Sequence, residues 1–82
     1  MNKLIQKQLE LAQMTVQALT VAGHLVQGIQ LDAFANRPMI WIAHTPRCKE
    51  LRGQRIVEEE SDGQRSYFYH TRIGDCVVRW RQ

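Results

Sequence analysis

The sequence predicts an α+β fold in which one amphipathic N-terminal helix packs on a four- to five-stranded antiparallel sheet arranged as a meander. The period of the apolar residues changes near Gly23: they recur every three to four positions before it, and they alternate or form short runs after it. Eighty-two residues predict one domain, 1–82, with the helix at about 3–22 and the sheet at about 24–81. Because a chain of this length hides only roughly 60–65% of its unfolded surface on folding, we expect no deep substrate cleft.

The helix is predicted from a stripe of apolar residues on one face. The stripe steps by four, three, four and three residues, through Ile5, Leu9, Ala12, Val16 and Leu19, and it is widened by Leu4, Leu11, Met14 and Ala18. Asn2 is a candidate N-cap, and Gly23 is expected to end the helix because glycine adopts the left-handed conformation without a Cβ clash. The same spacing is also a coiled-coil pattern, so a homodimer through this helix is the alternative to packing on the chain's own sheet.

Five strands are predicted after the helix, at residues 24–31, 39–43, 54–60, 65–73 and 76–81. The second is the most apolar run of the chain and therefore predicts a central strand. Gly28, inside the first, indicates a bulge or a close backbone approach. The connections are a loop at 32–37, a polar segment at 47–53 with room for one helical turn, and turns at Ser61-Asp62-Gly63 and Gly74-Asp75.

No pattern in the sequence predicts catalysis or metal binding. His44 and Cys48 are four residues apart, but Pro46 between them works against the helical geometry that would bring imidazole and thiol together. The two cysteines and three histidines lack the paired spacing of zinc ligands. The acidic residues at 58–60 alternate across a strand and do not converge on one cation. We therefore expect no enzyme, no metal and no cofactor.

The candidate binding surface is basic. Residues 37–82 carry nine basic and six acidic side chains, whereas residues 1–36 carry two of each. The last strand places Arg79 and Arg81 on the face opposite Trp80. Neighbouring strands and the polar connection extend the set of candidate protein- or nucleic-acid-binding residues to Arg47, Arg52, Arg55, Arg65, Arg72, Arg79 and Arg81.

Aromatic residues accompany these arginines, and their role is open. Arginine beside rings, here Tyr67, Tyr69 and Trp80, is typical of protein interfaces and of single-strand binding platforms alike. The alternative is a solvated outer face of the sheet with the rings turned into the core.

Two short apolar motifs resemble those of very short proteins encoded by tailed bacteriophages and prophages. Arg37-Pro38-Met39-Ile40-Trp41-Ile42 follows the helix, and Asp75-Cys76-Val77-Val78-Arg79-Trp80 closes the chain. The resemblance covers most of the length and carries over no catalytic residue. It implies a protein that binds and blocks a host component, such as restriction or CRISPR machinery. The net charge of +3 does not suit imitation of DNA, so contact with a host protein is the expected mode.

The expected function is therefore non-enzymatic binding and blocking of a host protein, with a small nucleic-acid-binding regulator as the alternative. The chain has no secretory signal and no apolar run long enough to span a membrane, which predicts a cytoplasmic protein with free thiols at Cys48 and Cys76. A monomer and a homodimer are both compatible with the sequence.

Overall fold

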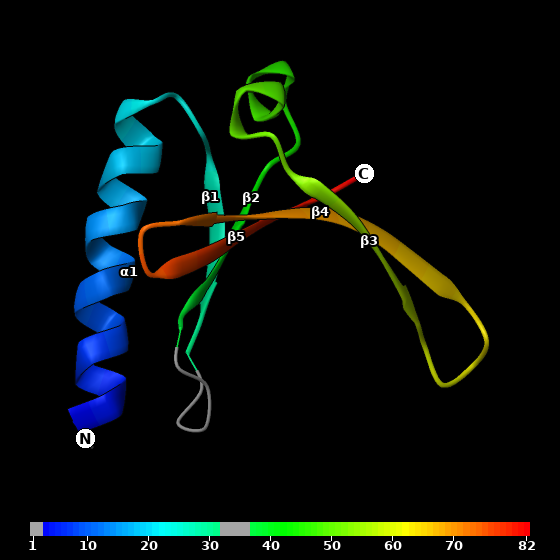
Figure 1. Cartoon of the computed structure of the whole chain (residues 1–82), viewed down its shortest axis with the longest axis horizontal. Helices are drawn as coiled ribbons and strands as arrows, with labels where there is room; N and C mark the ends of the chain where they lie inside the picture. The colour runs from blue at the N-terminus through cyan, green and yellow to red at the C-terminus, as the bar shows by residue number, and fades with distance from the viewer. Residues whose placement is uncertain (1–2, 32–36) are drawn as a thin grey trace.

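The computed structural model describes residues 3–31 and 37–82, where one helix packs on a five-stranded mixed sheet (Figure 1). The predicted N-cap Asn2 and residues 32–36 of the predicted loop lie outside the described residues. The elements are α1 (Lys3–Val21), β1 (Val26–Gln30), β2 (Met39–Ile42), the 3-10 helix η1 (Pro46–Leu51), β3 (Gln54–Glu59), β4 (Arg65–Ile73) and β5 (Cys76–Arg81).

The order of the strands is β1-β2-β5-β4-β3, so the expected antiparallel meander is wrong. β5 lies between β2 and β4, and it runs parallel to β2 while all other neighbours are antiparallel. The connection from β2 leads through η1 and the β3–β4 hairpin, which returns the chain to the free side of β2. Val77 N–H then donates to the Pro38 carbonyl at 3.0 Å, at the start of the parallel pair. β2 thereby gains a hydrogen-bonded neighbour on each side, as its apolar run requires.

The buried face of α1 is displaced from the predicted stripe. It consists of Gln8, Ala12, Thr15 and Leu19, whereas Leu9 is 37% exposed and Met14 is 70% exposed. The thiol of Cys76 donates to the Leu11 carbonyl at 3.5 Å, which brings the helix backbone close to β5. Small side chains such as Ala12 permit this approach, so the line of closest contact avoids the bulkier Leu9.

Gly23 ends α1 as predicted. Its φ is +92°, its N–H donates to Thr20 O at 3.0 Å, and His24 N–H donates to Leu19 O at 2.9 Å. These two bonds form a Schellman motif, which satisfies carbonyls that the last turn would leave unpaired. Arg47 of η1 donates from Nη1 to the Ala22 carbonyl at 3.4 Å, so the end of the helix is also tied to η1.

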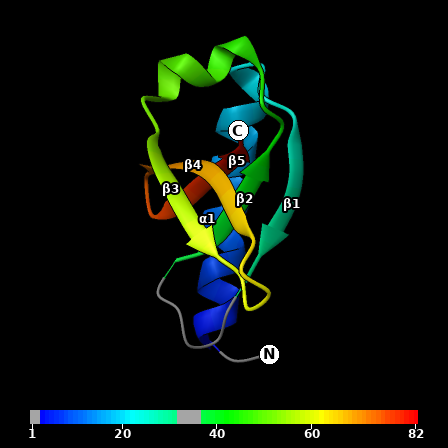
Figure 2. The same ribbon diagram turned by 90° about the vertical axis from the view of Figure 1, so that its right-hand side faces the viewer.

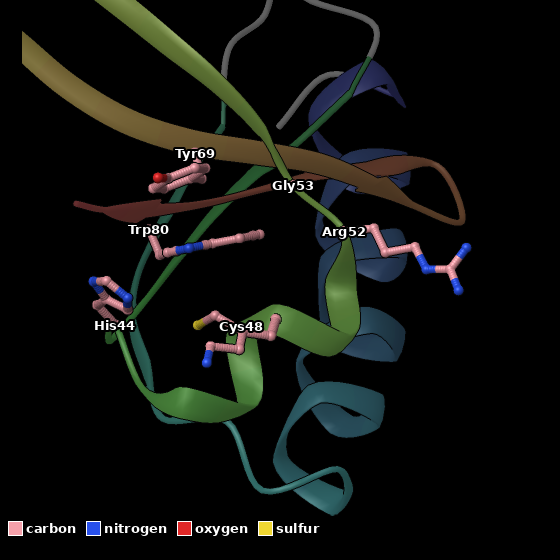
Figure 3. A pocket seen from close by; sticks show the side chains of 7 residues that line it. His44, Cys48, Arg52, Gly53, Tyr69 and Trp80 are labelled. Carbon is pink, nitrogen blue, oxygen red and sulfur yellow. The ribbon is translucent and has the colours of Figure 1, made fainter.

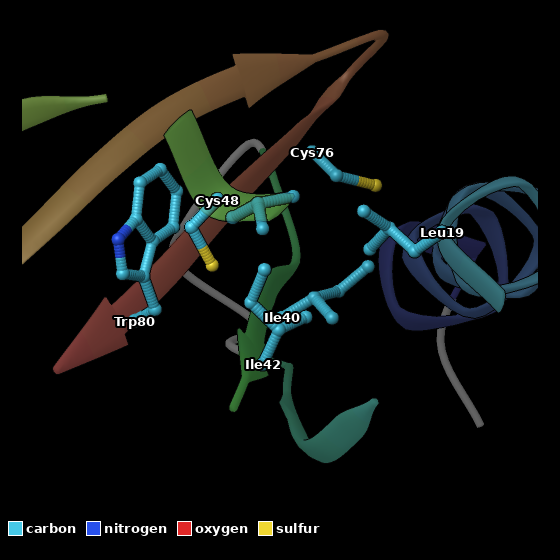
Figure 4. Close-up of a cluster of buried hydrophobic side chains, with 7 residues drawn as sticks. Leu19, Ile40, Ile42, Cys48, Cys76 and Trp80 are labelled. Carbon is cyan, nitrogen blue, oxygen red and sulfur yellow. The ribbon is translucent and has the colours of Figure 1, made fainter. Parts of the chain in front are cut away.

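The core lies between one face of the sheet and the two helices. We call this the packed face; from the strands it receives Ile40, Ile42, Cys76, Val78 and Trp80, and α1 and η1 add Leu19 and Cys48 (Figure 4). Both cysteines are free and buried. In Figure 2 η1 lies over one end of the sheet.

The second face of the sheet has no covering layer among the described residues. In Figure 1 the β3–β4 hairpin projects away from α1. A five-stranded sheet packed on one side therefore leaves a whole face for contacts outside the chain.

Candidate functional site

The open face is the side of the sheet opposite α1 and η1. Pairing between the strands defines its members, because residues directly opposite one another in neighbouring strands point to the same side. From β1 and β2 it receives Gly28, Gln30, Met39 and Trp41; from β5, Val77, Arg79 and Arg81; from β4, Ser66, Phe68, His70 and Arg72; and from β3, Gln54, Ile56 and Glu58.

Two rings and two guanidinium groups form the centre of this face. The Trp41 and Phe68 rings meet edge to face with their centroids 5.8 Å apart. The Arg79 guanidinium lies 4.5 Å from the Phe68 centroid, and that of Arg81 lies 5.2 Å from the Trp41 centroid. We call Trp41, Phe68, Arg79 and Arg81 the aromatic–arginine cluster. Guanidinium groups over rings are held by the attraction of the cation for the ring quadrupole, which stabilises this arrangement.

The four members of the cluster differ in how accessible they are. Phe68 is only 2% exposed although it lies on the open face, because its neighbours cover the ring. Arg79 is half-buried, and its Nε atom is shielded without a hydrogen-bond partner. Arg81 is exposed and Trp41 is partly exposed. A partner would therefore meet Arg81 and Trp41 first.

Positive charge is concentrated at the centre of the open face, where Arg79 and Arg81 lie. Arg72 on the same face is paired with Asp75, and the carboxylates of Glu58 and Glu60 lie toward the outer end of the hairpin, where Glu60 accepts a hydrogen bond of 2.8 Å from Ser66. His70 stands directly opposite Arg79, and its Nδ1 atom is also buried without a partner. An unpaired buried nitrogen lowers stability.

The candidate arginines of the strands are divided between the two faces. Arg72 joins Arg79 and Arg81 on the open face, where it also forms an exposed ion pair of 3.9 Å with Asp75. Arg55 and Arg65 lie on the other face of the β3–β4 hairpin. There the Arg55 guanidinium lies 5.0 Å from the centroid of Tyr67. The hairpin thus carries a smaller patch of its own, away from the aromatic–arginine cluster.

The two arginines of the polar connection lie around η1. Arg47 is engaged with the Ala22 carbonyl, as described above. Arg52 follows η1 in the left-handed conformation, with φ of 53°, and in Figure 3 its side chain points away from the stacked rings of Tyr69 and Trp80. It borders a hollow of about 210 Å³ lined by His44, Cys48, Lys49, Arg52, Gly53, Tyr69 and Trp80. This hollow lies on the packed side, so the η1 arginines and the open face are separate surfaces.

The aromatic partners of Arg79 and Arg81 were not identified from the sequence. Tyr69 and Trp80 stack on each other at 5.9 Å on the packed face, and the rings beside Arg79 and Arg81 on the open face are those of Trp41 and Phe68. A signal for Phe68 exists in the sequence: the tight turn at Gly74-Asp75 pairs Ile73 with Cys76 and so puts even positions of β4 beside odd positions of β5. Trp41 has no comparable signal, because its neighbour β5 is distant in the chain.

Among residues 3–31 and 37–82, no group of three or more His, Cys, Asp or Glu side chains is placed to hold a metal ion. In the same part of the chain, no helix combines the length and the apolar character needed to cross a membrane. Comparisons with protein-family models, with curated proteins and with solved structures find no match to this chain.

Proposed function

We propose that this chain is a non-enzymatic binding protein that occupies the surface of another protein through its open sheet face. The observation that carries the proposal is the aromatic–arginine cluster at the centre of a face that the chain itself leaves uncovered. Trp and Arg are the residue types most enriched at the energetic centres of protein interfaces. The resemblance to short phage proteins suggests a host protein as the partner, with blocking as the consequence of binding.

A nucleic-acid partner is the second candidate, and the geometry favours it less. A single-strand platform offers ring faces on which successive bases stack. Here Phe68 is almost fully covered, and the Trp41 ring is approached by both guanidinium groups, at 5.2 Å from Arg81 and 6.0 Å from Arg79.

An affinity capture from bacterial lysate tests the proposal; it is run with and without nuclease and eluted across a salt gradient. The bait is wild-type protein, compared with Arg81→Glu and with Arg65→Glu as a matched control. Both variants reverse one exposed arginine, but on opposite faces. We expect one near-stoichiometric protein with wild type and Arg65→Glu, and its loss with Arg81→Glu.

Three other outcomes contradict the proposal. Equal recovery by all three baits would place the interface elsewhere on the chain. Nucleic acid alone, lost early in the salt gradient, would support the regulator instead, because each phosphate contact releases a counterion. Recovery of nothing would exclude a stable protein partner in that lysate.

A further inference from the structure

A hollow lies on the open face beside the aromatic–arginine cluster. It has a volume of about 230 Å³ and is lined by Gln27, Gly28, Trp41 and Arg81. The register of β1 and β2 shifts between Val26 and Gly28, which is the irregularity that Gly28 predicted. As a result, the residue opposite Trp41 is one without a side chain. A Cβ atom at Gly28 would meet nothing within 4 Å, so the space above Trp41 is open.

The size of the hollow leaves room for a side chain that projects from a partner. Pockets for drug-sized ligands are about 300–1,000 Å³, and this hollow is smaller. Its walls combine an apolar ring, a guanidinium group and the amide of Gln27. A side chain with a short apolar stem and a negative end matches all three, because the stem packs on the ring while the carboxylate accepts from Arg81.

Building on the proposed function, we infer that this hollow seats a Glu or Asp side chain from an acidic segment of the partner protein. Charge complementarity extends beyond the hollow, since the Arg79 guanidinium lies next to it on the same face, 6.0 Å from the Trp41 centroid. An acidic segment lying across β2 and β5 would place carboxylates beside Arg81 and Arg79. Arg81 and the empty space at Gly28 fix the position of the first of these carboxylates.

The test fills the hollow without changing any charge. Gly28→Leu occupies the space above Trp41, and Gly28→Ala is the matched control that adds only a Cβ atom. Gly28 has no positive φ, and its Cβ position is unobstructed, so both variants keep a backbone that a side chain tolerates. Thermal unfolding followed by circular dichroism verifies that both are folded. A third variant, Arg81→Lys, retains the charge but loses the planar fork that binds a carboxylate through two parallel hydrogen bonds.

The probe is a fluorescein-labelled peptide of twelve residues in which Glu alternates with Val, and binding is followed by fluorescence anisotropy. The comparison probes are the same peptide with Lys in place of Glu and an oligothymidylate of equal length. We expect wild type and Gly28→Ala to bind the Glu peptide alike and the Lys peptide not at all. Gly28→Leu and Arg81→Lys should each bind the Glu peptide at least about tenfold more weakly, as for loss of a central interface contact.

Each contrary result overturns the inference in a distinct way. If Gly28→Leu binds the Glu peptide like wild type, or if wild type does not bind it, the hollow is not a carboxylate site. Tighter binding of oligothymidylate than of the Glu peptide would identify the occupant as nucleic acid. A dimer of wild type in sedimentation velocity that Gly28→Leu dissociates would identify it as a second copy of the chain.

Failure of this inference and failure of the proposed function are distinguishable. A partner captured by wild type, lost with Arg81→Glu and retained with Gly28→Leu would keep the open face as the interface and remove only the carboxylate site. Loss of that partner with Gly28→Leu, together with its displacement by the Glu peptide, would support both.

Discussion

Two arginines of one strand and one face have different physical roles. Arg79 lies over Phe68 with a shielded Nε, so it is part of the packing that covers that ring. Arg81 is exposed and lies at the edge of an open hollow. An alternating pattern of residues assigns both side chains to one face, but it does not separate a packing arginine from a contact arginine. Reversal of Arg81 is therefore a cleaner probe of binding than reversal of Arg79, which would also disturb the fold.

A single glycine on the packed face sets how closely the chain approaches Trp80. A Cβ atom at Gly53 would come within 2.4 Å of Cη2 of Trp80 and 3.2 Å of Cβ of Tyr69. We expect Gly53→Ala to lower the free energy of unfolding by about 1–3 kcal/mol, as for other overpacked sites. Urea unfolding followed by tryptophan fluorescence measures the change. Gly28→Ala is the control, because its new methyl group meets nothing and should raise stability by about 0.4–1 kcal/mol.

At the scale of the element, β2 presents its apolar residues to two different environments. Ile40 and Ile42 point into the core, and Trp41 between them points to the open face. We expect Ile40→Ala to cost about 2–5 kcal/mol of unfolding free energy, as for a fully buried aliphatic side chain. Trp41→Ala should cost clearly less, although it removes a larger side chain, and it should abolish binding at the open face. Chemical denaturation of the two variants, together with capture of the partner, tests both statements; an equal or larger loss of stability for Trp41→Ala would contradict them.

The boundaries of the elements were predictable because their signals are local. Gly23 ends α1, the predicted limits of β4 and β5 coincide with the observed ones, and the segment 47–53 contains the helical turn for which it had room. The buried face of α1 was less predictable, since its apolar residues cover more than half of the helix surface. Which of them turn inward depends on how closely the helix approaches β5, and no local pattern encodes that distance.

At the scale of the molecule, the parallel pair of β2 and β5 is the feature that the sequence did not reveal. These strands are separated by η1 and a complete hairpin, so no turn sets their register. The residues of the candidate site were likewise predictable where a local turn sets their position, and not where a distant strand pairing does. Arg72, Arg79 and Arg81 share a face through the local β4–β5 turn, whereas Trp41 reaches the aromatic–arginine cluster only through the distant pairing. Arg55 and Arg65 lie on the other face because the Asp62-Gly63 hairpin pairs them with Tyr69 and Glu59.

The uneven cover of the sheet predicts uneven stability. β3 is an edge strand paired with β4, and the outer half of this hairpin is exposed on both faces: Val57 and Tyr67 are 50% and 39% accessible on one face, and Glu58 is exposed on the other. We expect native-state hydrogen exchange, measured by NMR at increasing urea, to show the amides of 57–67 opening at a lower free energy than those of β2 and β5.

This difference bears on how the open face binds. Phe68 is the first residue of β4 after the exposed half of the hairpin to be fully buried, and it supports Arg79. If the Phe68 amide exchanges as slowly as the amides of β2 and β5, the aromatic–arginine cluster belongs to the stable part of the fold. A partner then binds a preformed surface without an ordering cost. Exchange of the Phe68 amide together with the hairpin tip would contradict this, because the cluster would then form only when the partner holds the hairpin in place.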